Sequence, residues 1–314
     1  MSLLVYNLDI EMEKAHKQIT LLGVLLLANT LTGGCFPSDG EGNWTVPWAS
    51  EIHPKYYASG EKLDSDSQDV VHTTTHIWLP GDGNKYYGME ARLDVYGFAL
   101  ESSQVSEAGI WIINRGDGQT SSMNGIMAGW HIWPSLYKDS QTHFFTSWTS
   151  AGADKDCKNM RCPGFQKTST SITPGDVISP VSDINGNKQS ITLRLFKDKS
   201  TGNWHIHYGF NGAPKPVGYI PKSLLPGLID KPVEIIFGGY VYHRKPQPSP
   251  PMGSGIDPIN GKAASFSSLK LIDEDGNDHA VNTDLPLRVD NPCYGITNIV
   301  SDGYFYYGGP SCVD

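Results

Sequence analysis

The stretch Y-Y-G-M-E-A-R-L-D-V-Y-G, residues 86–97, gives the clearest structural signal in the chain. Within it Ala91, Leu93 and Val95 are apolar, whereas the residues at 90, 92 and 94 are charged. An apolar residue at every second position is the pattern of a strand that buries one face and exposes the other. This stretch therefore predicts a half-buried β-strand.

Nine further segments predict strands, and clusters of Gly, Asn and Asp between them predict tight turns. The one segment with helical character, residues 222–228, predicts about one helical turn. Many short strands with almost no helix indicate an all-β fold, and we predict an antiparallel β-sandwich of ten or more strands. The nine segments are residues 71–78, 109–114, 125–133, 142–149, 190–197, 203–210, 233–242, 264–272 and 304–308.

The amino-terminal end has the layout of a secretory signal peptide. Basic residues including Lys14 and Lys17 precede an apolar run at residues 19–28, and the small residues Thr32-Gly33-Gly34 follow it. The run is too short to cross a bilayer comfortably, so a cleaved signal over residues 1–34 is preferred to a membrane anchor or a buried helix. Met1 and Met12 both remain possible initiators. We expect a secreted protein.

The chain after this signal divides into a leader and a domain. Residues 35–69 are polar and broken by Gly and Pro, which predicts an extended leader, and residues 70–314 carry the β pattern. The leader contains the one glycosylation sequon of the chain, at Asn43. No later stretch is apolar enough to cross a membrane, so we expect no membrane contact after signal removal.

Five cysteines bear on the compartment and on the fold. In an oxidising compartment we expect two local disulfides, one between Cys157 and Cys162 and one between Cys293 and Cys312. A zinc site is the alternative, but the eighteen-residue gap in the second pair does not suit it. Cys35 lies at the expected cleavage point, and its state is left open.

The net charge and the spacing of the histidines argue against three kinds of function, namely binding of nucleic acid, of anionic lipid and of a metal ion. The formal net charge of −9 gives no electrostatic reason to bind nucleic acid or anionic lipid. His72 and His76 share one strand face, as do His205 and His207, so two such pairs could build a metal site. No cysteine or carboxylate spacing completes either set, and we therefore expect polar strand faces, with no metal and no cofactor.

Nine short motifs between residues 124 and 310 carry a family resemblance. In chain order they are NGIMAGW (124–130), PSLYKD (134–139), FTSWT (145–149), CKNMRCPGF (157–165), KDKSTGNW (197–204), VGYIP (217–221), FGGYV (237–241), MGSG (252–255) and YGGP (307–310). Their order and spacing resemble the carboxyl-terminal domain of the neprosin family, plant glutamic endopeptidases that cut at proline. The resemblance implies a secreted, acid-active peptidase with a β-sandwich core. It also implies an amino-terminal pro-domain, for which the leader is too short.

The same resemblance places two catalytic glutamates at positions that this chain fills differently. Met127 stands before Ala128-Gly129-Trp130, and Tyr240 stands after Gly238-Gly239. Peptide hydrolysis without a metal or a covalent nucleophile needs one ionised and one protonated carboxyl group. Methionine does not titrate, and a phenol with a pKa near 10 is a poor base at acid pH. We therefore expect no catalytic residue at either position.

The expected function is that of a catalytically inactive neprosin-type module that binds extended or proline-containing peptides. We expect Trp130, His131, Tyr240 and Tyr242 to line its cleft. The main alternative is an active acid endopeptidase with a shifted carboxylate pair, and a structural surface protein is a weaker one. Two carboxylates facing each other near Met127 and Tyr240 would favour the active enzyme.

Overall fold

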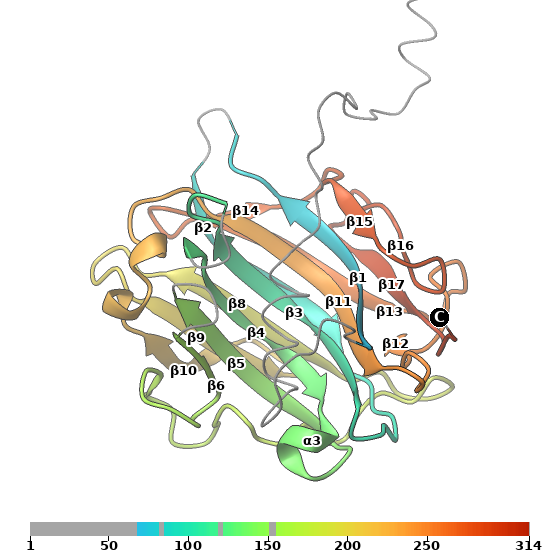
Figure 1. Ribbon diagram of the computed structural model, residues 1–314. Coiled ribbons are helices and arrows are strands. Elements are labelled where there is room, and N and C mark those ends of the chain that lie inside the picture. Colours follow the sequence, from blue (N-terminus) through green and yellow to red (C-terminus); the bar gives the residue numbers. More distant parts are fainter. Residues whose placement is uncertain (1–67, 82–84, 119–121, 151–154, 314) are drawn as a thin grey trace, which may run out of the picture. The chain divides into compact units, whose positions relative to one another are not determined.

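The computed structural model describes residues 68–81, 85–118, 122–150 and 155–313. These residues form two antiparallel sheets of seven and ten strands, which confirms the predicted all-β sandwich with little helix (Figure 1). The predicted signal peptide, Cys35, the sequon at Asn43 and nearly all of the leader lie outside the described residues. Within the described part of the chain, no helix has the length and apolar character needed to span a membrane.

The seven-stranded sheet contains five long neighbouring strands with a short strand at each edge. Every pairing in it is antiparallel and in continuous register. Its order is β15 (Leu287–Val289), β1 (Asp69–Trp78), β11 (Glu234–Arg244), β3 (Gln104–Asn114), β4 (Asn124–Ile132), β5 (Thr142–Ser150) and β6 (Lys155–Lys158).

The ten-stranded sheet packs against one face of the first sheet. Its order is β12 (Met252–Gly253), β17 (Phe305–Gly309), β13 (Ala264–Asp273), β2 (Tyr86–Asp94), β8 (Ser190–Lys197), β9 (Trp204–Phe210), β10 (Lys215–Ile220) and β7 (Gln166–Lys167), with β14 (Asp278–Ala280) beside β13 and β16 (Gly295–Ile296) beside β17.

Helical structure is limited to single turns in the described residues. The predicted helical segment forms two 3-10 turns, η3 (Lys222–Leu224) and η4 (Pro226–Leu228). A further turn, α3 (Pro134–Tyr137), connects β4 to β5. Proline at its start suits a first helical position, because that residue needs no backbone N–H donor. The left-handed Lys138 ends it and donates its backbone N–H to Pro134 O.

The core lies between the two sheets and follows the two-residue period of the strands. On β2 the side chains of Met89, Ala91 and Leu93 are fully buried there, whereas Arg92 is exposed. Asp94 departs from the simple alternation, since it is buried and its carboxylate accepts hydrogen bonds from the backbone N–H and hydroxyl of Ser265. Strand alternation therefore sets which side chains enter the core.

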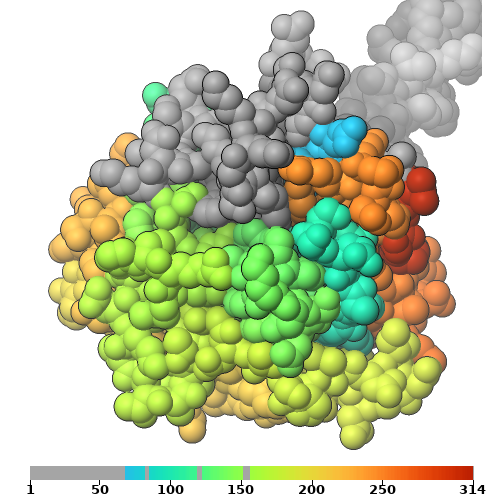
Figure 2. All heavy atoms as spheres, turned by 60° about the horizontal axis from the view of Figure 1, so that its bottom comes forward, coloured from blue at the N-terminus to red at the C-terminus, as the bar shows by residue number. Residues whose placement is uncertain are grey.

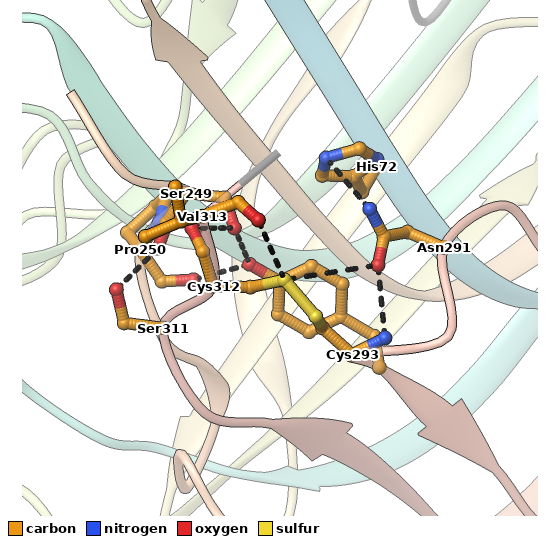
Figure 3. Close-up of a disulfide and its surroundings, with 9 residues drawn as sticks. His72, Ser249, Pro250, Asn291, Cys293, Ser311, Cys312 and Val313 are labelled. Carbon is orange, nitrogen blue, oxygen red and sulfur yellow. Dashed lines mark hydrogen bonds between the residues drawn. A yellow bond between two sulfur atoms is a disulfide. The ribbon is translucent and has the colours of Figure 1, made fainter. Parts of the chain in front are cut away.

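Both predicted disulfides are present. Cys157–Cys162 joins β6 to the short loop that follows it, and Cys293–Cys312 joins the carboxyl-terminal end to the loop before β16. Around the second bridge, Asn291 accepts a hydrogen bond from the backbone N–H of Cys293, and its amide nitrogen lies 3.3 Å from the Nε2 atom of His72 (Figure 3). Two disulfides are compatible with an extracellular protein.

Candidate functional site

The outer face of the seven-stranded sheet, turned away from the ten-stranded sheet, is unusually apolar. Outward positions of a sandwich are normally polar. Here ten buried apolar side chains form a second cluster, separate from the core between the sheets. They are Val105, Trp111, Ile113, Met123, Met127, Trp133, Phe145, Ile236, Tyr240 and Tyr242. Because sandwich packing does not account for this cluster, the outer face is the candidate site.

Two cross-strand rows organise the centre of the outer face. In one row Met127 on β4 lies opposite Trp111 on β3. In the other, Glu107 on β3 lies between Tyr240 on β11 and His131 on β4. Trp111 and Glu107 are four positions apart on β3, so the rows are about 13 Å apart along the strands.

A row of three glycines lies midway between these two rows. Gly238, Gly109 and Gly129 are in register on β11, β3 and β4. A Cβ atom on Gly129 would stand 2.2 Å from the backbone oxygen of Ala108, and one on Gly109 would stand 2.4 Å from that of Ala128. The sheet therefore requires glycine here, and the outer face has no side chains between the two rows over the width of three strands.

A chain of hydrogen bonds runs from the loop after β6 to Glu107, and it fixes the direction of each proton. Asn159 Oδ1 accepts from the backbone N–H of Thr146, so Nδ2 is the nitrogen that donates to the Tyr137 hydroxyl at 2.7 Å. The Tyr137 hydrogen is then directed to His131 Nε2, 2.8 Å away. Neutral His131 consequently carries its own proton on Nδ1, which faces Glu107 Oε2 at 3.4 Å.

Aromatic rings hold His131 in this position. Its ring stacks on Phe145 at a centroid distance of 4.2 Å and meets the edge of Trp133 at 5.6 Å. Tyr137 in turn stacks on His143, with centroids 3.6 Å apart. These hydrogen-bonded side chains thus lie among aromatic rings. In such surroundings a hydrogen bond is stronger than in water, and ionising a side chain costs more free energy.

Glu107 is the acid at the centre of the outer face, and its side chain is fully buried. Burial raises the pKa of Glu107 to about 7, while the positive charge of Lys158 and the indole N–H of Trp111 oppose the rise. Burial likewise lowers the pKa of the Lys158 ammonium group, against the influence of Glu107 and Asp156. Although Trp111 approaches, Oε1 of Glu107 makes no hydrogen bond of ordinary geometry. Glu107 is therefore mostly protonated at acid pH.

Other acids on this sheet are engaged elsewhere. Asp69 on β1 accepts hydrogen bonds from Arg244 and from the Tyr242 hydroxyl, at 2.8 and 2.7 Å. Glu234 at the start of β11 forms a two-point ion pair with Arg115. Among the residues that the structure describes, no hydrogen bond joins Glu107 to a second carboxylate.

Comparison with known families settles the membership of the chain. The model of the family described as Neprosin matches residues 102–310. The chain belongs to the neprosin family. Among solved structures, it is similar to a scytalido-glutamic peptidase with a peptide-based transition-state analogue, at 11% identity, covering 77% of this chain and 100% of that chain with a TM-score of 0.40. It is also similar to SCP-B, an eqolisin-family peptidase in a complex with the tripeptide Ala-Ile-His, at 11% identity, the same coverage and a TM-score of 0.38.

Both positions that the neprosin resemblance assigns to glutamates face the same side of the sheet. Met127 and Tyr240 belong to the same apolar cluster, and their side chains are 4% and 1% exposed. They lie on strands separated only by β3. The fold thus directs both positions of the implied acid pair to one face, where this chain has a thioether and a phenol.

The predicted cleft residues divide between the two faces of the sheet. His131, Tyr240 and Tyr242 lie on the outer face with Met127. Trp130 lies on the opposite face of β4, fully buried in the core between the sheets, where its indole N–H donates to Asp94 O at 2.9 Å. Because successive strand residues point to opposite faces, Trp130 cannot line a cleft that contains His131, and this corrects its assignment.

The two histidine pairs do not come together. His72 and His76 lie on β1 in the seven-stranded sheet, whereas His205 and His207 lie on β9 in the other sheet. Both ring nitrogens of His76 are within hydrogen-bonding distance of backbone oxygens, those of Leu285 and Thr297. Over residues 68–313, apart from the short gaps, no cluster of three or more His, Cys, Asp or Glu side chains could hold a metal ion.

Sequence reasoning missed Glu107 and Lys158. Glu107 precedes the segment predicted as a strand from Gly109, and β3 in fact starts five residues earlier, at Gln104. Extending the alternation backward from Trp111 would have placed Glu107 on the outer face. Lys158 lies between Cys157 and Cys162, and this segment was interpreted only as a disulfide loop.

Proposed function

We propose that this neprosin-family protein is secreted, and that it binds extended peptides on the outer face without hydrolysing them by a glutamate pair. The observation that supports this most directly is the outer face itself. Met127 and Tyr240 occupy the two implied acid positions within an apolar cluster, and the buried acid Glu107 lies opposite Tyr240 on the neighbouring strand. A peptidase of this kind needs two carboxyl groups in opposite protonation states around one water.

The chemistry of Glu107 agrees with binding rather than hydrolysis. At acid pH its carboxyl group is neutral and can donate a hydrogen bond, because its pKa is raised to about 7. A neutral acid can polarise a carbonyl group but cannot remove a proton from water. Losing one positioned acid or base costs about 10² to 10⁴ in rate. The second member of the pair would therefore have to come from outside this row.

Peptide binding is supported by the shape and composition of the outer face. The glycine row leaves backbone without side chains across three strands, which allows close approach of an extended chain. The neighbouring buried aromatic rings, including those of Trp111 and Tyr240, are flat apolar groups of the kind that stack on proline. We therefore propose extended or proline-containing peptides as the partners.

Secretion is proposed from the cysteines and the amino-terminal pattern. Two disulfides are typical of proteins that fold in an oxidising compartment. In this proposal residues 1–34 are removed as a signal peptide, residues 35–69 are a leader, and residues 70–314 are the functional domain.

The test compares peptide cleavage by the unmodified protein and by the double variant Met127→Glu with Tyr240→Glu, using proline-containing peptides from pH 3 to 7. We expect the unmodified protein to bind these peptides without cleaving them, and the double variant to gain cleavage at acid pH. A matched double variant with glutamines at both positions controls for size and polarity, and should stay inactive. Cleavage by the unmodified protein would contradict the proposal.

An active acid endopeptidase with a shifted carboxylate pair is the second candidate. The position of Glu107 directly opposite Tyr240 favours it, since this acid lies one strand away from an implied catalytic position. If the unmodified protein cleaves peptides and Glu107→Gln abolishes that activity, the second candidate replaces the first.

A further inference from the structure

A cavity of about 280 Å³ opens at the β6 end of the outer face. The turn around α3 forms one wall with Trp133, Ser135 and Leu136, and the disulfide loop forms the other with Lys158 and Arg161. Figure 2 brings the α3 end of the domain forward, where the green and yellow-green atoms of this part of the chain gather. The cavity is large enough for one side chain or chain end rather than for a whole ligand.

The lining carries more positive than negative charge. Lys158 is buried, with its Nζ atom 4.9 Å from the centroid of the Trp133 ring. Arg161 is exposed at the rim and donates to Leu136 O at 2.6 Å. Asp156 is the one acid in the lining. The lining thus holds two basic side chains and one acidic side chain.

The loop that carries the two cations is held from several sides. The Cys157–Cys162 bridge closes it, and a backbone hydrogen bond from Arg161 N to Lys158 O, at 3.1 Å, forms a turn inside it. Asn159 within the loop donates to the Tyr137 hydroxyl. Binding a ligand therefore costs little ordering of the loop, which favours affinity.

Strand register connects the cavity to the candidate site. Lys158 on β6 lies opposite Ser147 on β5, and Ser147 lies opposite Met127 on β4. The cavity thus continues the Met127 row to the edge of the sheet. A peptide that lies across this row would place one of its groups at the cavity.

We infer that this cavity is a carboxylate subsite, which takes the acidic group of a bound peptide between Lys158 and Arg161. The inference rests on the proposed peptide-binding function and names the class of peptide. The acidic group is either an Asp or Glu side chain or a carboxyl terminus. A guanidinium group can bind a carboxylate through two parallel hydrogen bonds, and a buried ammonium gains most from an opposite charge. A bound carboxylate would also offset the effect of burial, which lowers the pKa of Lys158.

The experiment measures binding of a peptide series to the full-length protein by calorimetry at pH 6. One arm compares a free carboxyl terminus with its amide, and the other compares an internal Asp with Asn. We expect at least one acidic peptide to bind roughly ten to a hundred times more tightly than its neutral partner, as for a charged hydrogen bond, and less so at high salt. The arm that shows the preference identifies the source of the carboxylate.

Variants assign the preference to the cavity. Arg161→Gln at the exposed rim should remove most of it, and Arg161→Lys should retain part of it. Lys215→Gln, an exposed cation on β10 of the other sheet, should leave it unchanged. Equal binding of acidic and neutral peptides would overturn the carboxylate subsite but not the proposed function. So would a preference for acidic peptides that persists in both Arg161→Gln and Lys158→Met. Failure of every peptide to bind would overturn the proposed function as well.

Discussion

Replacing Glu107 by glutamine should make the protein more stable at neutral and alkaline pH. The side chain is fully buried between Tyr240 and His131, and burial raises its pKa from 4.5 to about 7. Glutamine has nearly the same shape as the protonated acid. Its amide oxygen can still accept from His131 Nδ1, and it carries no charge at any pH.

The magnitude and the sign follow from linkage between protonation and folding. An acid whose pKa is higher in the folded state binds more protons there, so its stabilising contribution is complete below pH 4.5 and is lost as the pH rises through 7. At 1.36 kcal/mol per pH unit, the difference amounts to about 3 kcal/mol. For a domain of this size, this shift corresponds to about 6 to 12 °C in Tm. Other acids, such as Asp198 with its pKa lowered to about 2, contribute equally to the stability of both proteins. Their contributions therefore cancel in the difference between the two free energies of unfolding.

Urea unfolding at pH 4, 5.5, 7 and 8.5, with disulfides intact, measures the free energy of unfolding of both proteins. The difference, Gln variant minus unmodified protein, should grow by about 3 kcal/mol across this range. Glu234→Gln, which removes a partly exposed ion pair with Arg115 on the same sheet, should show no such growth with pH. A difference for Glu107→Gln that is flat from pH 4 to 8.5, or that falls, would refute the reasoning.

Three further changes test the packing and the cross-linking of the fold. Gly129→Ala should destabilise the domain by about 2 kcal/mol or more, because the new Cβ would lie 2.2 Å from a backbone oxygen of β3, whereas Gly261→Ala, with open space around it, should be nearly neutral. Replacing both Cys293 and Cys312 by alanine should cost about 3 kcal/mol, the loop-closure entropy for a separation of 19 residues. Thermal unfolding measures all three changes, and wild-type stability in Gly129→Ala or in the alanine pair would contradict the corresponding estimate.

Much of the fold was predictable because its information is local. The alternation at residues 86–97 identified β2, and all nine other predicted segments coincide with strands to within a few residues except at the start of β3. The disulfides were predictable because each joins cysteines close in sequence. Strands such as β7 and β12 have two residues each, too few to show a period, and β10 contains an irregularity between Pro216 and Gly218. Such pieces form because a neighbouring strand offers hydrogen-bond partners.

The candidate site was only partly predictable. Family motifs drew attention to Met127 and Tyr240, and both lie on the outer face. Trp130 was expected in the cleft together with His131, but its side chain lies on the opposite face of β4, in the core between the sheets. Glu107 had no motif around it, and the cations of the disulfide loop had no spacing that suggested a site.

The sequence by itself determined that the chain forms a β-sandwich, that two local disulfides stabilise it, and that an aliphatic thioether and a phenol stand where the family resemblance implies acids. These features depend on residue identity and on a two-residue period. Only the tertiary structure decided that residues 240, 107 and 131 form one row, with Lys158 at the edge of the same face. The two-residue period specifies which face a side chain occupies, but strand register specifies its neighbours. Part of that register comes from pairing between distant segments, since Glu107 and Tyr240 lie more than a hundred residues apart in sequence.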